Sequence, residues 1–178
     1  IVYSIFNEKG KYRITLGMSG KQLGQTFWAM RFSSLTIVMV LGLAYVMNFS
    51  GMTISIGQFL AHTGSLFALL SPVLGWVGTA VTGSDTSANA LFSSLQYEAA
   101  QSNASLAHVS PDLFLAANTM GGVIGKMISP QSLAIAAVTT GEHESSLFKK
   151  VIPWSVGMLA VLCVLVFAES SVLSFILP

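Results

Sequence analysis

Charged residues are scarce in this sequence, and their scarcity limits the class of protein that it can form. Only 8% of the 178 residues are Asp, Glu, Lys or Arg, whereas 53% are hydrophobic. A soluble domain carries about 25% charged residues, because its surface faces water. The composition therefore excludes an ordinary soluble domain and predicts an all-α membrane protein. A net charge of only +1 also excludes a strong general attraction to nucleic acid.

Cysteines and clustered catalytic or metal-binding residues are scarce as well. Cys163 is the single cysteine, which excludes an internal disulfide, and its apolar neighbours predict a small buried side chain. Gln58 and His62 lie four residues apart on one predicted helical face, which is not a metal-ligand pattern. The chain lacks a Ser/His or His/Glu set at catalytic spacing. We therefore predict no catalytic residue, no metal site and no cofactor.

Long apolar runs predict one membrane domain that includes two uninterrupted spans. Residues 32–50 cover about 28 Å at 1.5 Å per residue, enough to cross the hydrocarbon core, and residues 151–169 form a second span. Residues 65–100 form two short apolar arms around a polar tip, which favours a re-entrant helical hairpin. Residues 113–140 form a span broken in its middle by glycines and a proline.

Two further features concern orientation and completeness. The basic segments 8–31 and 141–150 fall on the same side of this layout, and the positive-inside rule predicts that both are cytoplasmic loops. The chain opens at Ile1, without an initiator Met or a signal-peptide pattern. We therefore expect a piece of a longer protein, whose N-terminal half supplies the other half of the site, either as a monomer or as an oligomer.

Both interruptions carry residues that start a helix. After Gly83, the residues Ser84, Asp85 and Thr86 can cap the next helix, and residues 129–131 (Ser-Pro-Gln) repeat the device with Pro in the first turn. The first N–H groups of a helix lack internal partners and lie at the positive end of its dipole. Two such ends that face one cavity would hold a small carboxylate.

The two charged residues beside these helix starts are candidates for ion coupling. Lys126 adds a full positive charge just before the second start. Burial disfavours the ionised form of a carboxyl group, so Asp85, with Lys126 as its partner, is the candidate proton carrier. Thr119 is a further polar candidate. The predicted substrate-binding residues are Ser84, Asp85, Thr86, Ser87, Asn89, Asn118, Lys126, Ser129 and Gln131.

Simpler roles for the same residues stay open. Asp85 can merely cap a helix, and Lys126 can merely reach toward the interface or pair with Asp85. The Gly121-x3-Gly125 spacing can serve close helix packing instead of a substrate site. Gln96, which precedes Tyr97 and Glu98, is expected where the second hairpin arm returns to water.

Several stretches of the sequence resemble the L-lactate permease family. They are Gly83-Ser-Asp-Thr-Ser-Ala-Asn-Ala-Leu-Phe92, Gly125-Lys-Met-Ile-Ser-Pro-Gln-Ser132, and the run from Leu41 to Met52 with Met30-Arg-Phe32 before it. The resemblance covers nearly the whole chain and implies the C-terminal part of a bacterial permease. It implies a proton-coupled symporter of lactate and glycolate in the inner (plasma) membrane. It also implies kinship with the ion-transporter superfamily, whose halves each hold a re-entrant hairpin and a broken helix.

The sequence thus favours a multi-pass transport protein for small 2-hydroxy monocarboxylates, with H⁺ as the coupling ion. The alternative from another class is a membrane-embedded structural or assembly subunit, in which the two breaks only pack against partners. An intramembrane enzyme ranks third, for want of a catalytic set. Lactate uptake separates the first two, because a structural subunit gives none.

Overall fold

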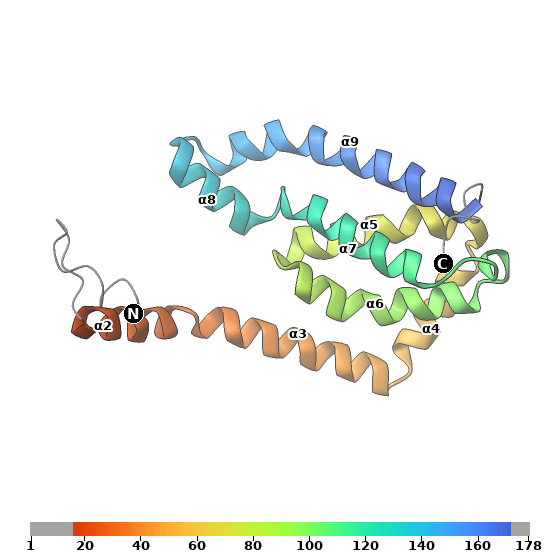
Figure 1. The fold of residues 1–178 in the computed structure, drawn as a ribbon, viewed down its shortest axis with the longest axis horizontal. Coiled ribbons are helices and arrows are strands. Elements are labelled where there is room, and N and C mark those ends of the chain that lie inside the picture. The colour runs from red at the N-terminus through yellow and green to blue at the C-terminus, as the bar shows by residue number, and fades with distance from the viewer. Residues whose placement is uncertain (1–15, 172–178) are drawn as a thin grey trace. The chain divides into compact units, whose positions relative to one another are not determined.

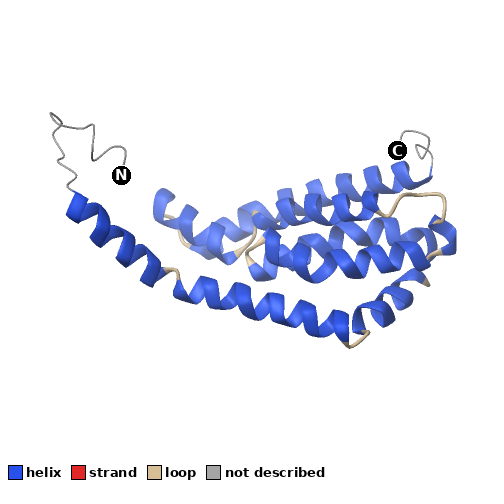
Figure 2. Cartoon of the chain, turned by 60° about the horizontal axis from the view of Figure 1, so that its bottom comes forward, coloured by secondary structure: helices blue, strands red, loops and turns tan. Residues whose placement is uncertain are grey.

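The protein is seen here as a computed structural model that describes residues 16–171, which form helices and no strands (Figures 1 and 2). The helices are α2 (Leu16–Ala29), α3 (Arg31–Phe49), α4 (Met52–Ala61), η1 (Gly64–Leu66), α5 (Phe67–Thr82), α6 (Asp85–Ser102), η2 (Ala104–Leu106), α7 (Asp112–Lys126), α8 (Pro130–Thr140) and α9 (Glu144–Ser171). The chain divides into two compact units, Ile1–Met39 and Val40–Pro178.

The first unit contains α2 and the start of α3. The prediction of a loop over 8–31 is wrong for residues 16–29, which form α2. Leu23 and Phe27 lie four residues apart on that helix and give it an apolar stripe. The prediction relied on the nearby charges and did not use this spacing. Of the charges that suggested a loop, Lys9, Lys11 and Arg13 lie outside the described residues, whereas Lys21 lies within α2.

In the second unit, α5 and α7 pack against each other along glycine-lined backbones. A Cβ built on Gly121 would lie 2.8 Å from the carbonyl carbon of Pro72, and one on Gly125 would lie 3.0 Å from that of Trp76. Only glycine allows such an approach, so the Gly-x3-Gly spacing does serve helix packing here. Beside this contact, the rings of Phe67 and Phe114 have centroids 5.2 Å apart in the buried core.

Helix α9 contacts α5, α7 and α8, and hydrogen bonds fix it to the first two. Ser155 Oγ accepts from Trp76 Nε1 at 2.9 Å and lies 3.2 Å from the Ile124 carbonyl oxygen, to which it donates. The helix begins at Glu144, so the loop expected over 141–150 shrinks to residues 141–143. Lys150 Nζ lies 2.8 Å from the Glu142 carboxylate, and this contact lowers the pKa of Glu142.

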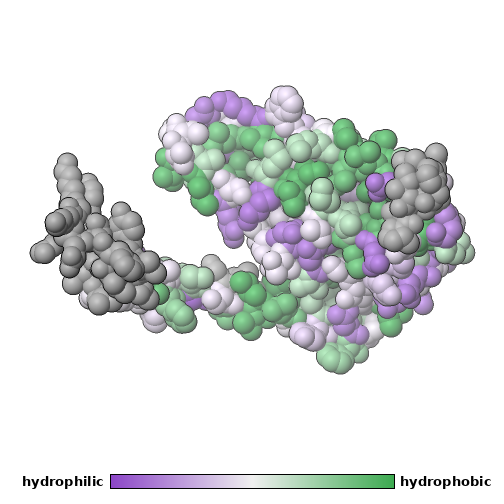
Figure 3. All heavy atoms as spheres, viewed as in Figure 1, coloured by the Kyte–Doolittle hydropathy of each residue, from purple (hydrophilic) through white to green (hydrophobic). Residues whose placement is uncertain are grey.

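Two helical segments within residues 16–171 are long and apolar enough to cross a membrane, namely Gly64–Thr82 and Glu144–Ser171. A third candidate is the pair Ile37–Phe49 and Met52–Ala61, which is bent by 74° at its break. Hydrophobic atoms cover much of α9 in Figure 3. The fold is therefore that of an all-α membrane protein. The first arm of the expected hairpin is itself long and apolar enough to cross the membrane. Helix length therefore does not decide whether residues 65–100 are re-entrant, and their re-entrant course stays a prediction.

Candidate functional site

Two helices begin at capped breaks in the second unit. Helix α5 ends at Gly83, whose φ of +70° is a left-handed conformation that suits glycine. Helix α6 then begins with Ser84 as its N-cap, whose Oγ accepts from the Ser87 N–H at 3.3 Å. Helix α8 begins after Met127–Ser129 in the same way, and Ser129 Oγ accepts from the Ser132 N–H at 3.4 Å. Each break thus presents a helix N-terminus.

The two breaks lie against each other. A Cβ built on Gly83 would lie 2.8 Å from Gln131 Cδ, so the second break contacts the turn of the first. Lys126 Nζ donates a hydrogen bond to the Gly83 carbonyl oxygen. This places a cation at the C-terminal end of α5, where the helix dipole favours positive charge. In Figure 3, hydrophilic atoms gather in the middle of the view, where Figure 1 places these two breaks.

Asp85, the first residue of α6, points its two carboxylate oxygens at different partners. Oδ1 faces Thr79 Oγ1 at 3.5 Å, and Oδ2 accepts from Asn89 Nδ2 at 3.3 Å. Gly122 on α7 makes room for Oδ1, because a Cβ there would overlap this oxygen and lie 2.7 Å from Thr79 Oγ1. Lys126 lies near enough for its charge to attract the carboxylate.

A chain of hydrogen bonds leads from Asn89 into the protein interior. Asn89 Oδ1 accepts from Asn118 Nδ2 at 2.6 Å and from Thr119 Oγ1 at 3.2 Å. Asn118 Oδ1 accepts from Gln96 Nε2 at 2.6 Å, and Gln96 also bonds to the side chain and main chain of Ser71. The Ser71, Gln96 and Asn118 side chains are fully buried. The chain therefore joins α5, α6 and α7 through polar groups.

Sequence reasoning missed part of this arrangement. Gln96 was expected at the return of the hairpin to water, and this is wrong, since Gln96 lies in the core between Ser71 and Asn118. A usable signal exists, because Asp85, Asn89 and Gln96 are separated by four and seven residues and share one helical face. Read as a stripe, this spacing predicts an inward-facing polar line along α6.

The predicted site residues fall into groups. Hydrogen bonds bring together Asp85, Asn89 and Asn118. Lys126 and Gln131 lie against Gly83, where the two breaks meet, and we call this meeting point the tip. Of the rest, Ser84 and Ser129 are the N-caps of α6 and α8. Ser87 is buried and donates its main-chain N–H to Ser84, whereas Thr86 is exposed.

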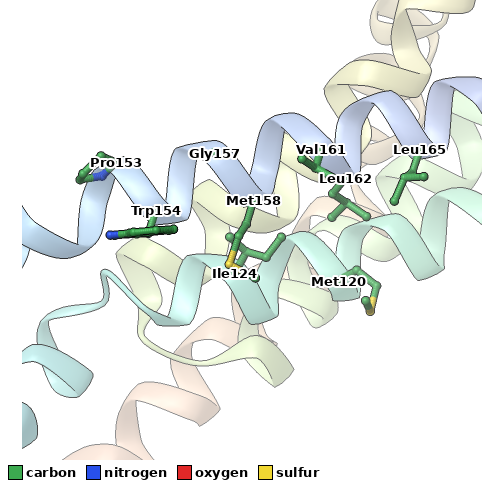
Figure 4. Close-up of a pocket in the computed structure, with 9 residues that line it drawn as sticks. All are labelled: Met120, Ile124, Pro153, Trp154, Gly157, Met158, Val161, Leu162 and Leu165. Carbon is green, nitrogen blue, oxygen red and sulfur yellow. The ribbon is translucent and has the colours of Figure 1, made fainter.

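A separate cavity of about 590 Å³ lies between α7 and α9 (Figure 4). Its lining is apolar, with Met120 and Ile124 from α7 and Trp154, Met158 and Leu162 from α9. Apart from the indole N–H of Trp154, this lining has no hydrogen-bond donor side chain and no charge, so the cavity does not suit a small anion. Within residues 16–171, no three His, Cys, Asp or Glu side chains lie where they could hold a metal ion.

The arrangement at the breaks can attract a small anion and offer it hydrogen bonds. Two helix N-termini and Lys126 supply positive potential, and side-chain hydroxyls and amides stand beside them. Asp85 adds a group that can exchange a proton. All of these residues lie in the second unit.

Comparison with known proteins gives one consistent family. A family model described as L-lactate permease matches residues 8–173. The L-lactate permease of Bacillus subtilis (strain 168) is 45% identical over 161 residues, which are 89% of this chain and 28% of that protein. The glycolate permease GlcA of Escherichia coli (strain K12) is 45% identical over 150 residues, 83% of this chain and 26% of that protein.

The L-lactate permease of Escherichia coli (strain K12) is 43% identical over 157 residues, 87% of this chain and 28% of that protein. The chain thus spans under a third of the length of these curated relatives. No solved structure matches the chain.

Proposed function

The chain belongs to the L-lactate permease family, and we propose that it forms part of a permease that carries lactate and glycolate across the bacterial inner membrane by proton symport. The observation that carries this proposal is the contact between the two breaks, where two capped helix starts and Lys126 meet at Gly83, two residues before Asp85. The names of the relatives supply the substrate class, small 2-hydroxy monocarboxylates.

Substrate binding follows from the charges at the tip. The substrate carboxylate takes the free N–H groups at the starts of α6 and α8. Lys126 leaves the Gly83 carbonyl oxygen, which it contacts here, and pairs with the carboxylate instead. Thr86 and Gln131 are exposed beside the tip and receive the 2-hydroxyl group. A monocarboxylate without this hydroxyl group then binds more weakly.

Proton coupling follows from the position of Asp85. An ionised Asp85 beside an anion site repels the substrate, so the site favours substrate together with one proton. When that proton binds the carboxylate, the substrate anion and the proton cross as a neutral pair. Release of both on the other side restores the ionised Asp85 and its attraction to Lys126.

The proposed layout places residues 8–31 and 141–150 in the cytoplasm, on the basis of their Lys and Arg residues. Residues 65–100 enter and leave the membrane on one side, and residues 113–140 span it as two half-helices. This layout exposes the two helix starts to a cavity within the membrane, which the rest of the permease completes.

Uptake by the full-length permease tests the function. Purified protein in liposomes, given an inward proton gradient, is expected to accumulate radiolabelled L-lactate, and a protonophore should abolish the accumulation. Glycolate should compete and acetate, which lacks the 2-hydroxyl group, should compete poorly. A membrane-embedded structural or assembly subunit gives no uptake above protein-free liposomes, and that result would reject the transport function. Accumulation that follows a sodium gradient instead would reject proton symport.

A further inference from the structure

The buried hydrogen-bond chain between α5 and Asp85 runs in a single direction. Gln96 donates to Asn118 Oδ1, Asn118 donates to Asn89 Oδ1, and Asn89 donates to Asp85 Oδ2. Every link is an amide N–H that points toward the carboxylate. The donor–acceptor distances are 2.6, 2.6 and 3.3 Å in that order.

One main-chain group fixes this direction at the Gln96 end, as the acceptor oxygen of Asp85 does at the other end. Gln96 Nε2 lies 3.2 Å from the Ser71 carbonyl oxygen, and a carbonyl oxygen can only accept. A reversed Gln96 amide would bring its own oxygen against that carbonyl oxygen, so the donor must face Ser71 and Asn118. Ser71 Oγ donates to Gln96 Oε1 and completes the anchor. Because Gln96 is fixed, the amides of Asn118 and Asn89 have one favourable orientation each.

The direction makes the two oxygens of Asp85 unequal. Oδ2 already accepts a hydrogen bond from Asn89 Nδ2, which disfavours an acid proton on that oxygen. Oδ1 faces Thr79 Oγ1 at 3.5 Å, and a hydroxyl group can either donate or accept. The hydrogen bonds therefore favour Oδ1, which lies against Gly122, as the atom that carries a proton on Asp85.

We propose that Gln96 is a positioning residue for substrate and proton binding, acting at a distance through Asn118 and Asn89 on Asp85. The inference rests on the proposed transport function and adds a residue of the core to the site. Without Gln96, the buried Asn118 Oδ1 loses its donor, and the Asn118 and Asn89 side chains are no longer held in place against Asp85. The hydrogen bond that offsets the negative charge of the carboxylate is then weaker, and a substrate anion meets stronger repulsion.

Lactate counterflow in liposomes that contain the full-length permease tests this role. Gln96→Met keeps the shape of the side chain and removes its donor, and we expect the KM for lactate to rise about tenfold or more. Gln101→Met is the matched control, because Gln101 is an exposed glutamine of the same helix whose side chain donates to Tyr97 Oη on the protein surface. It should leave the KM unchanged.

Two further variants separate positioning from support of the fold. Ser71→Ala removes the buried hydroxyl group but keeps the carbonyl oxygen that orients Gln96, so it should lower the melting temperature without a comparable rise in KM. In an Asn89→Ala background the chain is already cut, so Gln96→Met should raise the KM no further, although it still lowers the melting temperature. If Gln96→Met does not fold, Asn118→Leu cuts the next link and should raise the KM similarly.

Three results would overturn the inference while transport itself persists. They are a Gln96→Met protein with the KM of the Gln101→Met control, a Ser71→Ala protein with the same rise in KM as Gln96→Met, and equal effects of Gln96→Met with and without Asn89. Absence of lactate transport by the unaltered permease would instead reject the proposed function. Because the unaltered protein is measured in the same assay, the two failures are distinguishable.

Discussion

Gly122 on α7 gives a sharp test of where Asp85 lies. A Cβ built on Gly122 would overlap Asp85 Oδ1, lie 2.7 Å from Thr79 Oγ1 and lie 3.2 Å from Asp85 Cγ. The larger overlap is with the Asp85 carboxylate, while Thr79 is fully buried, so the Asp85 side chain must move furthest. Gly122→Ala therefore displaces the carboxylate and leaves its chemistry intact.

Two opposing terms set the effect of Gly122→Ala on stability. Alanine in a helix gains about 0.5–1 kcal/mol over glycine, while forcing an extra methyl group into a packed site costs about 1–3 kcal/mol. The net loss in the free energy of unfolding is thus small, at most about 2.5 kcal/mol. Transport is more sensitive, since a misplacement of about 1 Å in a site can cost on the order of 10²-fold in rate.

The assay is proton-driven lactate uptake by the full-length permease, with the melting temperature measured on the same preparations. Gly157→Ala on α9 is the matched control, because nothing lies within 4 Å of its built Cβ. We expect the control to transport normally and Gly122→Ala to lose most of its uptake while it stays folded. A folded Gly122→Ala protein with normal uptake would refute the placement of Asp85 against α7.

Two other predictions concern the tip. Lys126→Gln removes the charge proposed to pair with the substrate, a bond worth about 1.5–3 kcal/mol, so the KM for lactate should rise about tenfold or more. The control Lys149→Gln, at an exposed lysine, should leave the KM unchanged. An unchanged KM in folded Lys126→Gln would assign that lysine to packing. In a full-length permease in which Cys163 and every other native cysteine are replaced by Ser, Thr86→Cys should react with a polar thiol reagent and the buried Ala88→Cys should not. Equal protection of both would contradict a wet cavity at the first break.

Local chemistry in the sequence accounts for the helix starts. Gly83 with Ser84, and Ser129 with Pro130, are strong signals because a left-handed residue, a capping hydroxyl group and a proline in the first turn each have one favourable place in a helix. The breaks they predict fall where α5 ends and α6 and α8 begin.

Other features depend on contacts that no single segment reveals. Gln96 stands among polar neighbours in the sequence, yet its burial follows from partners on α5 and α7, 25 and 22 residues away. The sequence prediction missed helix α2 because the charged residues that precede it suggested a loop. Helix α9 begins at Glu144, so its first turn adds polar residues that precede the apolar run. Hydropathy alone assigns these polar residues to a loop. The membrane course of residues 65–100 depends on the bilayer and the rest of the permease.

The most direct test of the account is Asp85→Asn in the full-length permease, measured by lactate counterflow and by proton-driven accumulation in the same liposomes. Asparagine keeps the size of the side chain and cannot carry the proton. We predict that counterflow persists and that accumulation no longer follows the pH gradient. Accumulation that still follows the pH gradient in the Asp85→Asn protein would contradict the account and leave Asp85 with a structural role in the first turn of α6.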